Sequence, residues 1–299
     1  MNVKAISAAI AVSVGAILNP AEGDTLKNVS GAAEIPSADG DSPLKARVKR
    51  SSLREKIAKS CKITGEDVWY GYRRIKFDFN GRKAWIVEPS AAPAEGTPWT
   101  WTMQWAEAFV TRTGVPDLLA RGYHHVTIDL FDTRMDEAGL KAAAEYQKFL
   151  VGELGFAAKA NLVGMSWGGF FSTRYAAEHP ENVRRIYLDA PLLNFDGFGN
   201  PDYGRIGVWA DRKPADGVWT ADPEMPINKA VKIAKAKIPV LLIYGCADTV
   251  VPVSQNCRIF AARFKAAGGE ISEIPRGLFG HHPHGLDPDG TGPIVDFFQ

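Results

Sequence analysis

The chain has 299 residues, of which 45% are hydrophobic and 23% are charged, and its formal net charge is +1. This length and apolar content suffice for one large core or two small ones. The near-neutral charge argues against a nucleic acid or an acidic polymer as a partner.

The N-terminal 21 residues differ in character from the rest of the chain. Lys4 precedes fourteen mostly small apolar residues, 5–18, a run that is too short to span a bilayer comfortably but typical of a signal peptide. Ala16 and Ala21 are the candidate cleavage positions, and the alternative is an N-terminal helix that stays in place. We therefore predict that residues 1–21 are a signal peptide. The protein would then be exported (periplasmic or secreted), with no stable membrane insertion after cleavage.

Residues 22–60 have the composition of a linker or N-terminal extension. They are rich in Ala, Ser, Pro and Asp, and then become basic. The basic part could form a short surface helix, but it lacks the interleaved aromatic residues of a nucleic-acid-binding surface. We expect the folded domain to span residues 61–299.

Strand and helix patterns alternate along this domain. A polar–apolar alternation surrounds Asn80-Gly81, which is the strongest short-range signal for a β-hairpin. Continuous apolar runs then alternate with amphipathic stretches, as in a parallel sheet covered by helices on both faces. The expected strands are 97–103, 124–130, 160–164, 183–190, 238–245 and 270–275. The helix-like stretches are 106–123, 136–155, 168–180, 254–269 and 291–299, and each of them follows one of these strands. The strand 183–190 has no helix-like stretch directly after it. The sequence thus predicts an α/β fold with an antiparallel edge at its start.

Residues 191–237 break this alternation, with many Gly, Pro, Asp and Trp residues and little periodicity. An insertion of this size between two strands of a sheet is a candidate cap over a site. Its aromatic residues either form a wall of that site or simply pack on the sheet. They are Phe195, Phe198, Trp209 and Trp219.

The segment NLVGMSWGGF, residues 161–170, places a serine between glycines at the end of an apolar run. Gly164 to Gly168 match G-x-S-x-G between an expected strand and an expected helix, which is the context of a nucleophile elbow. The serine of such a turn has a strained backbone, and bulky neighbours would clash with it. Ser166 would lie at a helix N-terminus, where free N–H groups stabilise a developing negative charge.

A serine hydroxyl needs a base, and the base needs a carboxylate that orients it. In this architecture the chain order is serine, acid, histidine, each near the C-terminal end of a strand. Asp248, in the turn after 238–245, is the candidate acid, and Asp189 is the alternative. Asp129 and Asp132 are interpreted as turn and helix-cap residues.

Histidines cluster in the sequence GHHPHG near the C-terminus. His281 is the candidate base, with His282 and His284 as alternatives. The same histidines, together with Asp287 and Asp289, could instead ligate a metal. Because a triad already accounts for a histidine here, we expect neither a metal nor another cofactor. His124 and His125, at the opposite end of their strand, are interpreted as structural.

The oxyanion hole should combine the backbone N–H of Trp167 with a second N–H near the strand 97–103. The usual His-Gly pair is missing there, and Trp101 is the candidate donor. The nearby side chains of Trp99, Thr102 and Trp105 are candidate substrate contacts. The tryptophans around the site favour an aryl or sugar-bearing ester, and the alternative is that they are core residues: Trp99, Trp101, Trp105 and Trp167.

Cys246 and Cys257 lie eleven residues apart, on either side of the segment that holds the candidate acid. In an oxidising compartment they could form a disulfide that braces this loop. The alternative is a pair of small buried thiols.

With these residues identified, the chain resembles the α/β-hydrolase superfamily from about Trp69 to Gln299. It is similar to a group of mostly exported bacterial serine hydrolases with prolyl-oligopeptidase-like and dienelactone-hydrolase-like relatives. The matching pieces are FNGRKAWIVEP, PWTW, GMSWGG, IYLDAP, AKAKIPVLLIYGCADTVVP and GHHPHGLDPDGTGPIVDFF. That group usually carries arginine where Thr102 and Trp167 stand, which implies an altered pocket rim.

The resemblance implies an α/β-hydrolase fold with Ser166 as nucleophile, Asp248 as acid and His281 as base. The functional hypothesis is a serine hydrolase that cleaves a carboxylic ester, on a small molecule or linked to a glycan, through an acyl-enzyme. The alternatives are a serine peptidase of the prolyl-oligopeptidase type, a non-catalytic binding module on a hydrolase scaffold, and a lyase or acyltransferase. The sequence predicts no particular oligomeric state.

Overall fold

The computed structural model of the chain describes residues 52–198 and 206–299. A nine-stranded sheet with the order β1-β2-β3-β5-β4-β6-β7-β8-β9 runs through them. The predicted signal peptide, 1–21, lies outside the described residues. Within the described part, no helix combines the length and the apolar character that crossing a membrane requires.

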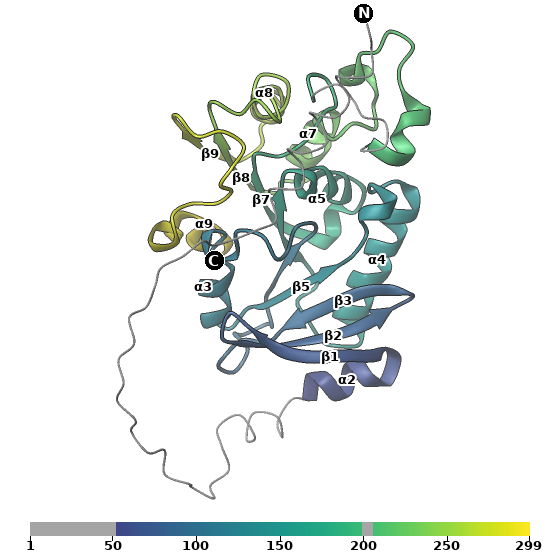
Figure 1. The fold of residues 1–299 in the computed structure, drawn as a ribbon, viewed down its shortest axis with the longest axis vertical. Coiled ribbons are helices and arrows are strands. Elements are labelled where there is room, and N and C mark those ends of the chain that lie inside the picture. The colour runs from purple at the N-terminus through teal and green to yellow at the C-terminus, as the bar shows by residue number, and fades with distance from the viewer. Residues whose placement is uncertain (1–51, 199–205) are drawn as a thin grey trace, which may run out of the picture. The chain divides into compact units, whose positions relative to one another are not determined.

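Four strands follow one another after the first helix, and from there on helices and strands alternate along the chain (Figure 1). The strands are β1 (Lys62–Trp69), β2 (Tyr72–Phe79), β3 (Arg82–Val87), β4 (Trp99–Thr102), β5 (His124–Ile128), β6 (Ala160–Met165), β7 (Val183–Asp189), β8 (Val240–Gly245) and β9 (Ile271–Arg276). The α-helices are α2 (Ser52–Ser60), α3 (Val115–Ala120), α4 (Glu137–Gly152), α5 (Trp167–Glu178), α7 (Pro226–Lys235), α8 (Cys257–Ala266) and α9 (Gly292–Phe298).

The first three strands form an antiparallel edge of the sheet. β1 pairs with β2, β2 with β3, and β3 with β5 in antiparallel fashion, whereas the remaining pairs are parallel. In the turn between β2 and β3, Asn80 and Gly81 have φ values of 51° and 81°. Two positive φ values are the type I′ geometry that Asn-Gly favours, so the predicted hairpin is confirmed.

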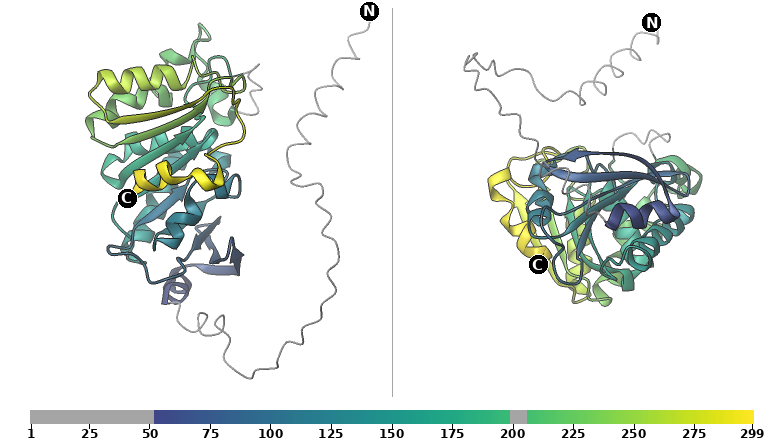
Figure 2. Two further views of the ribbon diagram at one scale, coloured as in Figure 1. Left: turned by 90° about the vertical axis from the view of Figure 1, so that its left-hand side faces the viewer. Right: turned by 90° about the horizontal axis from the view of Figure 1, so that it is seen from below.

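The parallel strands bury side chains on both faces. On β6, Leu162 belongs to one core and Val163 to the other, and on β7 Leu188 and Tyr187 divide in the same way. The larger core contains residues of α2, α4, α5, α7 and α8, and the smaller one residues of α3 and α9. Seen from below, α9 lies on one side of the sheet and α2 and α4 on the other (Figure 2). Burial on both faces explains the continuous apolar runs of these strands.

The folded unit begins before residue 61. Among the described residues, α2 already buries Leu53 and Ile57 in the larger core. The expected short helix is therefore present, but the predicted linker boundary at residue 60 is wrong. Two apolar residues four positions apart share one helix face, which the basic composition of the segment conceals.

The segment 191–237 is more regular than its sequence indicates. Its last part forms α7, which packs on α5 and α8 and buries Ile227 and Ile233. This part is a crossover helix of the fold rather than a cap, so the irregular stretch ends before residue 226. The aromatic residues of that stretch that were singled out in the sequence are buried: Phe195, Phe198, Trp209 and Trp219.

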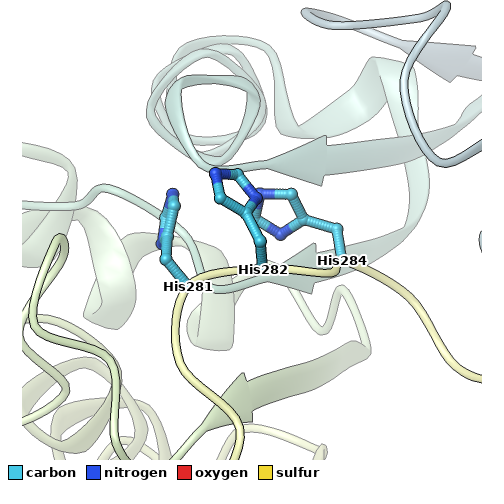
Figure 3. A group of neighbouring side chains, drawn as sticks. All are labelled: His281, His282 and His284. Atoms are coloured by element: carbon cyan, nitrogen blue, oxygen red, sulfur yellow. The ribbon is translucent and has the colours of Figure 1, made fainter. Parts of the chain in front are cut away.

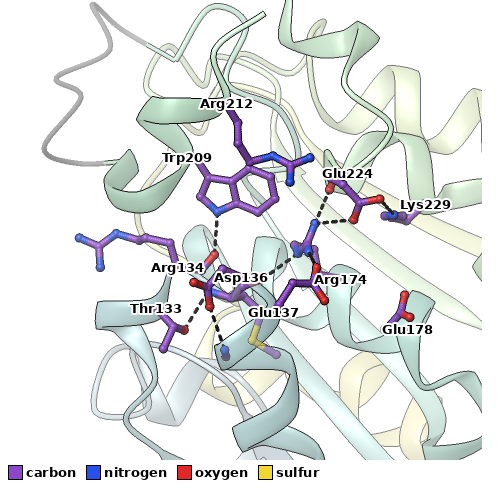
Figure 4. A network of polar contacts seen from close by, with 12 residues as sticks. Thr133, Arg134, Asp136, Glu137, Arg174, Glu178, Trp209, Arg212, Glu224 and Lys229 are labelled. Carbon is purple, nitrogen blue, oxygen red and sulfur yellow. Dashed lines mark hydrogen bonds and ion pairs between the residues drawn. The ribbon is translucent and has the colours of Figure 1, made fainter.

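Arg174 of α5 ties this irregular stretch to the helical layer (Figure 4). Its guanidinium donates to the Met135 carbonyl at 2.8 Å and to the Glu224 carbonyl at 2.6 Å, and it lies 4.6 Å from the ring centre of Trp209. The Trp209 indole N–H donates in turn to the Arg134 carbonyl at 3.0 Å. The stretch is thus anchored to the helix that begins at the G-x-S-x-G motif.

Candidate active site

Ser166 lies where β6 turns into α5. Its φ and ψ are 49° and −117°, a sparsely populated conformation that costs on the order of 1–3 kcal/mol. A Cβ atom at Gly164 would lie 2.8 Å from the Gly168 carbonyl oxygen. The turn therefore needs glycine at this position, as the sequence motif predicts.

Ser166, His281 and Asp248 form a continuous chain of hydrogen bonds. Ser166 Oγ lies 3.1 Å from His281 Nε2, and His281 Nδ1 lies 2.8 Å from Asp248 Oδ2. Asp248 Oδ1 accepts hydrogen bonds from the N–H groups of Val250 and Val251, each at 2.9 Å. Burial raises the pKa of Asp248, but the hydrogen bonds from His281 and Val251 outweigh it, so the pKa lies below its ordinary value. The carboxylate is thus ionised near neutral pH and oriented toward the imidazole.

The loops after β8 and β9 hold the acid and the histidine next to each other. The Ala247 N–H donates to the Phe279 carbonyl at 2.9 Å, which joins the two loops. A Cβ atom at Gly245 would lie 2.1 Å from the Gly280 carbonyl oxygen. Gly245, the last residue of β8, therefore lets the histidine loop approach the strand.

A second aspartate–histidine pair lies beside this chain. His284 Nδ1 is 2.6 Å from Asp189 Oδ1, and Asp189 Oδ2 accepts hydrogen bonds from the Gly285 N–H and the Tyr187 hydroxyl at 2.9 and 2.8 Å. Both side chains of the pair are buried. Asp189 and His284 were the alternative acid and base, and the structure pairs them with each other instead of with Ser166 and His281.

His282 is the exposed histidine of the loop. Its ring stacks on Phe109, with the ring centres 5.5 Å apart. Among the described residues, His281 is the histidine that hydrogen-bonds to Ser166, so the geometry selects it over His282. Asp287, proposed with Asp289 as a rival metal ligand, forms an ion pair with Arg112 at 3.0 Å, and both aspartates are exposed.

Two backbone N–H groups are candidates for an oxyanion hole. Trp167 is the first residue of α5, so its N–H has no partner within the helix. The Gln104 nitrogen lies 3.5 Å from the position of a Cβ atom on Gly168, at the start of the same helix. Trp101 instead lies inside β4, which pairs with β5 and β6, and its side chain is fully buried. The prediction of Trp101 is therefore wrong, and Gln104 is the candidate donor.

A model of the alpha/beta hydrolase fold matches residues 104–213, and no curated protein matches the sequence. The chain has the α/β-hydrolase fold.

Solved structures of this fold include hydrolases of different kinds. A putative dipeptidyl aminopeptidase IV from Bacteroides ovatus superposes with a TM-score of 0.58 at 16% identity, over 73% of this chain and 33% of its own. A puromycin-hydrolyzing peptidase from Mycobacterium tuberculosis gives 0.55 at 17% identity, over 80% and 37%. An S-formylglutathione hydrolase from Agrobacterium tumefaciens gives 0.55 at 16% identity, over 79% and 95%. The chain thus spans about a third of the length of the two peptidases.

The candidate substrate contacts differ in how deeply their side chains are buried. Trp99 is 0% exposed and Thr102 is 3% exposed, and both lie inside β4. Neither side chain reaches the surface, so the prediction of a substrate contact is wrong for both. Trp105 is 41% exposed and follows the strand by three residues, which keeps it a candidate.

The side chain of Trp167 is buried among aromatic rings beside the elbow. Its ring centre lies 5.4–6.2 Å from those of four phenylalanines and 5.7 Å from the guanidinium of Arg134. The phenylalanines are Phe131, Phe170, Phe195 and Phe198. Two of them belong to the irregular stretch that starts at residue 191, so the residue after the serine connects this stretch to the elbow.

The loops that carry the acid and the base also carry exposed apolar side chains. Val250 follows the acid by two residues, and Leu278 and Phe279 immediately precede the histidine segment. Their exposed fractions are 49%, 96% and 42%. Exposed apolar side chains on the two loops that hold the candidate acid and base are therefore candidate contacts for an apolar ligand.

The two cysteines near the acid are not joined. Cys246 is exposed and Cys257 is buried at the start of α8, and both are free thiols. Burial raises the pKa of Cys257 well above its ordinary value. The structure therefore has neither the disulfide nor a pair of buried thiols, because only Cys257 is buried.

Proposed function

We propose that this protein is a serine hydrolase that cleaves carboxylic esters through an acyl-enzyme. The observation that carries the proposal is the hydrogen-bonded chain from Ser166 through His281 to Asp248, with the serine at a strained elbow. Nucleophile and base within hydrogen-bond reach, with a third group that orients the base, are the requirements for serine catalysis.

In the proposed reaction, Ser166 Oγ attacks the ester carbonyl carbon while His281 Nε2 takes its proton. Asp248 keeps the imidazole in the orientation that presents Nε2 to the serine and stabilises the imidazolium. The N–H groups of Trp167 and Gln104 donate to the carbonyl oxygen as it becomes negative. The alcohol then leaves with the proton from His281. A water molecule, activated by the same imidazole, hydrolyses the acyl-enzyme and restores the serine.

An ester is favoured over a peptide by the chemistry of the leaving group and by the surroundings of the site. An alkoxide leaves more readily than an amide anion, so the cleavage of an ester depends less on exact proton delivery to the leaving group than the cleavage of a peptide does. The exposed side chains of Trp105, Val250, Leu278 and Phe279 favour apolar or aryl groups on the substrate. The fold itself accommodates an S-formylglutathione hydrolase as well as peptidases, so the substrate class has to be measured.

The test is a substrate panel with the Ser166→Ala variant beside the wild type. The panel contains p-nitrophenyl esters of increasing acyl length, a methyl hydroxycinnamate, an acetylated sugar, and proline-containing peptide p-nitroanilides. We expect turnover of the esters and a loss of at least about 10⁴-fold in the variant. A fluorophosphonate should label the wild type at Ser166 and leave the variant unlabelled.

Two outcomes would contradict the proposal. Turnover of the peptide anilides with inert esters would replace the ester substrate by a peptide. Ester turnover that persists in Ser166→Ala, with an unchanged circular dichroism spectrum, would exclude Ser166 as the nucleophile.

A further inference from the structure

Three imidazoles converge in the loop after β9. His281, His282 and His284 each offer one ring nitrogen, and these three nitrogens lie within 4.8 Å of one another. Their ring centres are 4.7–5.0 Å apart. Figure 3 shows that the three side chains project from the same side of the loop. The triad uses one of these rings, so the other two need a separate explanation.

Two of the three imidazole rings are bound to a carboxylate through one ring nitrogen, as metal-binding histidines in proteins commonly are. Asp248 pairs with Nδ1 of His281 at 2.8 Å, and Asp189 pairs with Nδ1 of His284 at 2.6 Å. A carboxylate on one ring nitrogen leaves the other nitrogen for the metal and makes it more basic. The side chains of both pairs are at most 5% exposed. Two buried carboxylates behind the imidazole rings also favour a dication at this place.

His282 would supply the third ligand from the solvent side. Its side chain is exposed and hydrogen-bonds to neither aspartate in the described part of the chain. Zinc–nitrogen bonds of about 2.0–2.1 Å in a tetrahedral site place ligand nitrogens about 3.3 Å apart. The present spacing must therefore contract by at most about 1.5 Å. Rotation of the exposed His282 side chain brings its nitrogen closer to the other two, and His281 and His284 approach each other by small adjustments of their loop. Imidazoles suit zinc, copper and nickel better than magnesium or calcium.

We propose that His281, His282 and His284 form an inhibitory site for a divalent transition metal, with Zn²⁺ as its representative. A metal on His281 Nε2 occupies the lone pair that would accept the proton of Ser166, whose Oγ lies 3.1 Å away. The occupied enzyme is therefore inactive, and removal of the metal restores activity. The inhibition rests on the proposed serine hydrolase function, whereas metal binding does not. This site differs from the metal site considered on the sequence, because Asp287 and Asp289 take no part and the metal opposes catalysis.

Binding is tested first, independently of activity. The chelator-treated full chain is titrated with Zn²⁺ by isothermal calorimetry as wild type, His282→Gln, Ser166→Ala and His179→Gln. His179 lies at the end of α5, 3.8 Å from Glu181, and is the matched control. We expect one Zn²⁺ per wild-type chain, affinity at least about tenfold weaker in His282→Gln, and unchanged affinity in the other two variants. Equal affinity in wild type and His282→Gln overturns the site.

Inhibition is tested on the best ester of the panel, with each variant compared with its own metal-free rate. Zn²⁺ should inhibit the wild type and His179→Gln at concentrations that match the calorimetric affinity, and a chelator should reverse it. His282→Gln should need at least about tenfold more Zn²⁺, and Mg²⁺ should have no effect. Full activity with one bound Zn²⁺ overturns the inhibitory role. If no ester is turned over at all, the proposed function fails, and calorimetry still decides whether the metal binds.

Discussion

Asp189 Oδ1 and His284 Nδ1 lie 2.6 Å apart in the interior, next to a triad that contains another aspartate–histidine pair. The two pairs have the same chemistry but different partners beyond the histidine. His281 continues to Ser166 at 3.1 Å, whereas Asp189 also binds the backbone of Gly285 at 2.9 Å. One pair is therefore placed for proton transfer and the other for holding the histidine loop on β7.

We expect Asp189→Asn to lower the stability of the fold. The carboxylate accepts three hydrogen bonds and is fully buried, and an amide cannot accept all of them. The free energy of unfolding should fall by about 2–4 kcal/mol, as measured by urea denaturation. The turnover number of the folded variant should stay within about tenfold of the wild type. The Asp189 carboxylate hydrogen-bonds to no member of the triad, and its backbone carbonyl, which accepts from the Ser166 N–H at 3.0 Å, is unchanged in the variant. Unchanged stability would contradict the loop-holding role.

The variant Asp248→Asn should lose little stability and much activity, the opposite of Asp189→Asn. The amide oxygen can still accept from the N–H groups of Val250 and Val251, so the loss of stability should be smaller than in Asp189→Asn. The imidazole loses the carboxylate that orients it, and the turnover number on the best ester should fall by about 10³–10⁴-fold. The two variants are each other's controls. A large loss of turnover in Asp189→Asn and a small one in Asp248→Asn would exchange the assignments.

Gly168→Ala tests the second oxyanion donor. The new Cβ atom would lie 3.3 Å from the Gln104 carbonyl oxygen and 3.5 Å from its nitrogen, so the Gln104 backbone must shift by a few tenths of an ångström. We expect the turnover number to fall by about 10–100-fold, while the free energy of unfolding changes by no more than about 1 kcal/mol, since alanine favours the helix. Gly152→Ala, where nothing lies within 4 Å, is the control. Normal turnover in Gly168→Ala would argue against the Gln104 N–H.

Local sequence patterns predict the hairpin, the buried strands and the three members of the triad. Asn-Gly requires a particular turn, and G-x-S-x-G between a strand and a helix requires the elbow. The segment Lys62–Trp69 carried no such signal. It is an edge strand in which seven of eight residues are not fully buried, so Lys, Glu and Asp occupy positions where a central strand has apolar residues.

The errors share one physical cause, which is contact between segments far apart in the sequence. Trp99 and Trp101 are buried because β4 pairs with both β5 and β6, and nothing in the sequence TPWTWTM indicates two neighbours. Asp189 and His284, 95 residues apart, have the same side chains as an acid and a base of a triad. Only the folded structure shows which aspartate–histidine pair holds a loop and which one hydrogen-bonds to the serine.

His124 allows a test of the interpretation, made from the sequence, that His124 and His125 are structural residues. Its side chain is buried against Phe156, with the ring centres 4.5 Å apart, and its Nδ1 has no hydrogen-bond partner in the described part of the chain. Burial lowers the pKa of His124 to about 4. The unfolded chain binds this proton below about pH 6.5 and the folded chain only below about pH 4. Stability is therefore lost as the pH falls between these two values.

The variant His124→Phe should remove both the unpaired buried nitrogen and the loss of stability at low pH. At pH 7.5 we expect the free energy of unfolding to rise by about 1 kcal/mol, because an unpaired buried nitrogen is replaced by carbon. At pH 5 the gain should increase by about a further 2 kcal/mol, because the variant no longer takes up this proton on unfolding. Urea denaturation at the two pH values measures both effects. His125→Phe is the contrasting variant, since His125 Nδ1 is paired with the Thr100 hydroxyl at 2.8 Å. It should also reduce the dependence on pH but lose stability at pH 7.5. A His124→Phe variant with the wild-type dependence on pH would show that His124 is not buried in its neutral form.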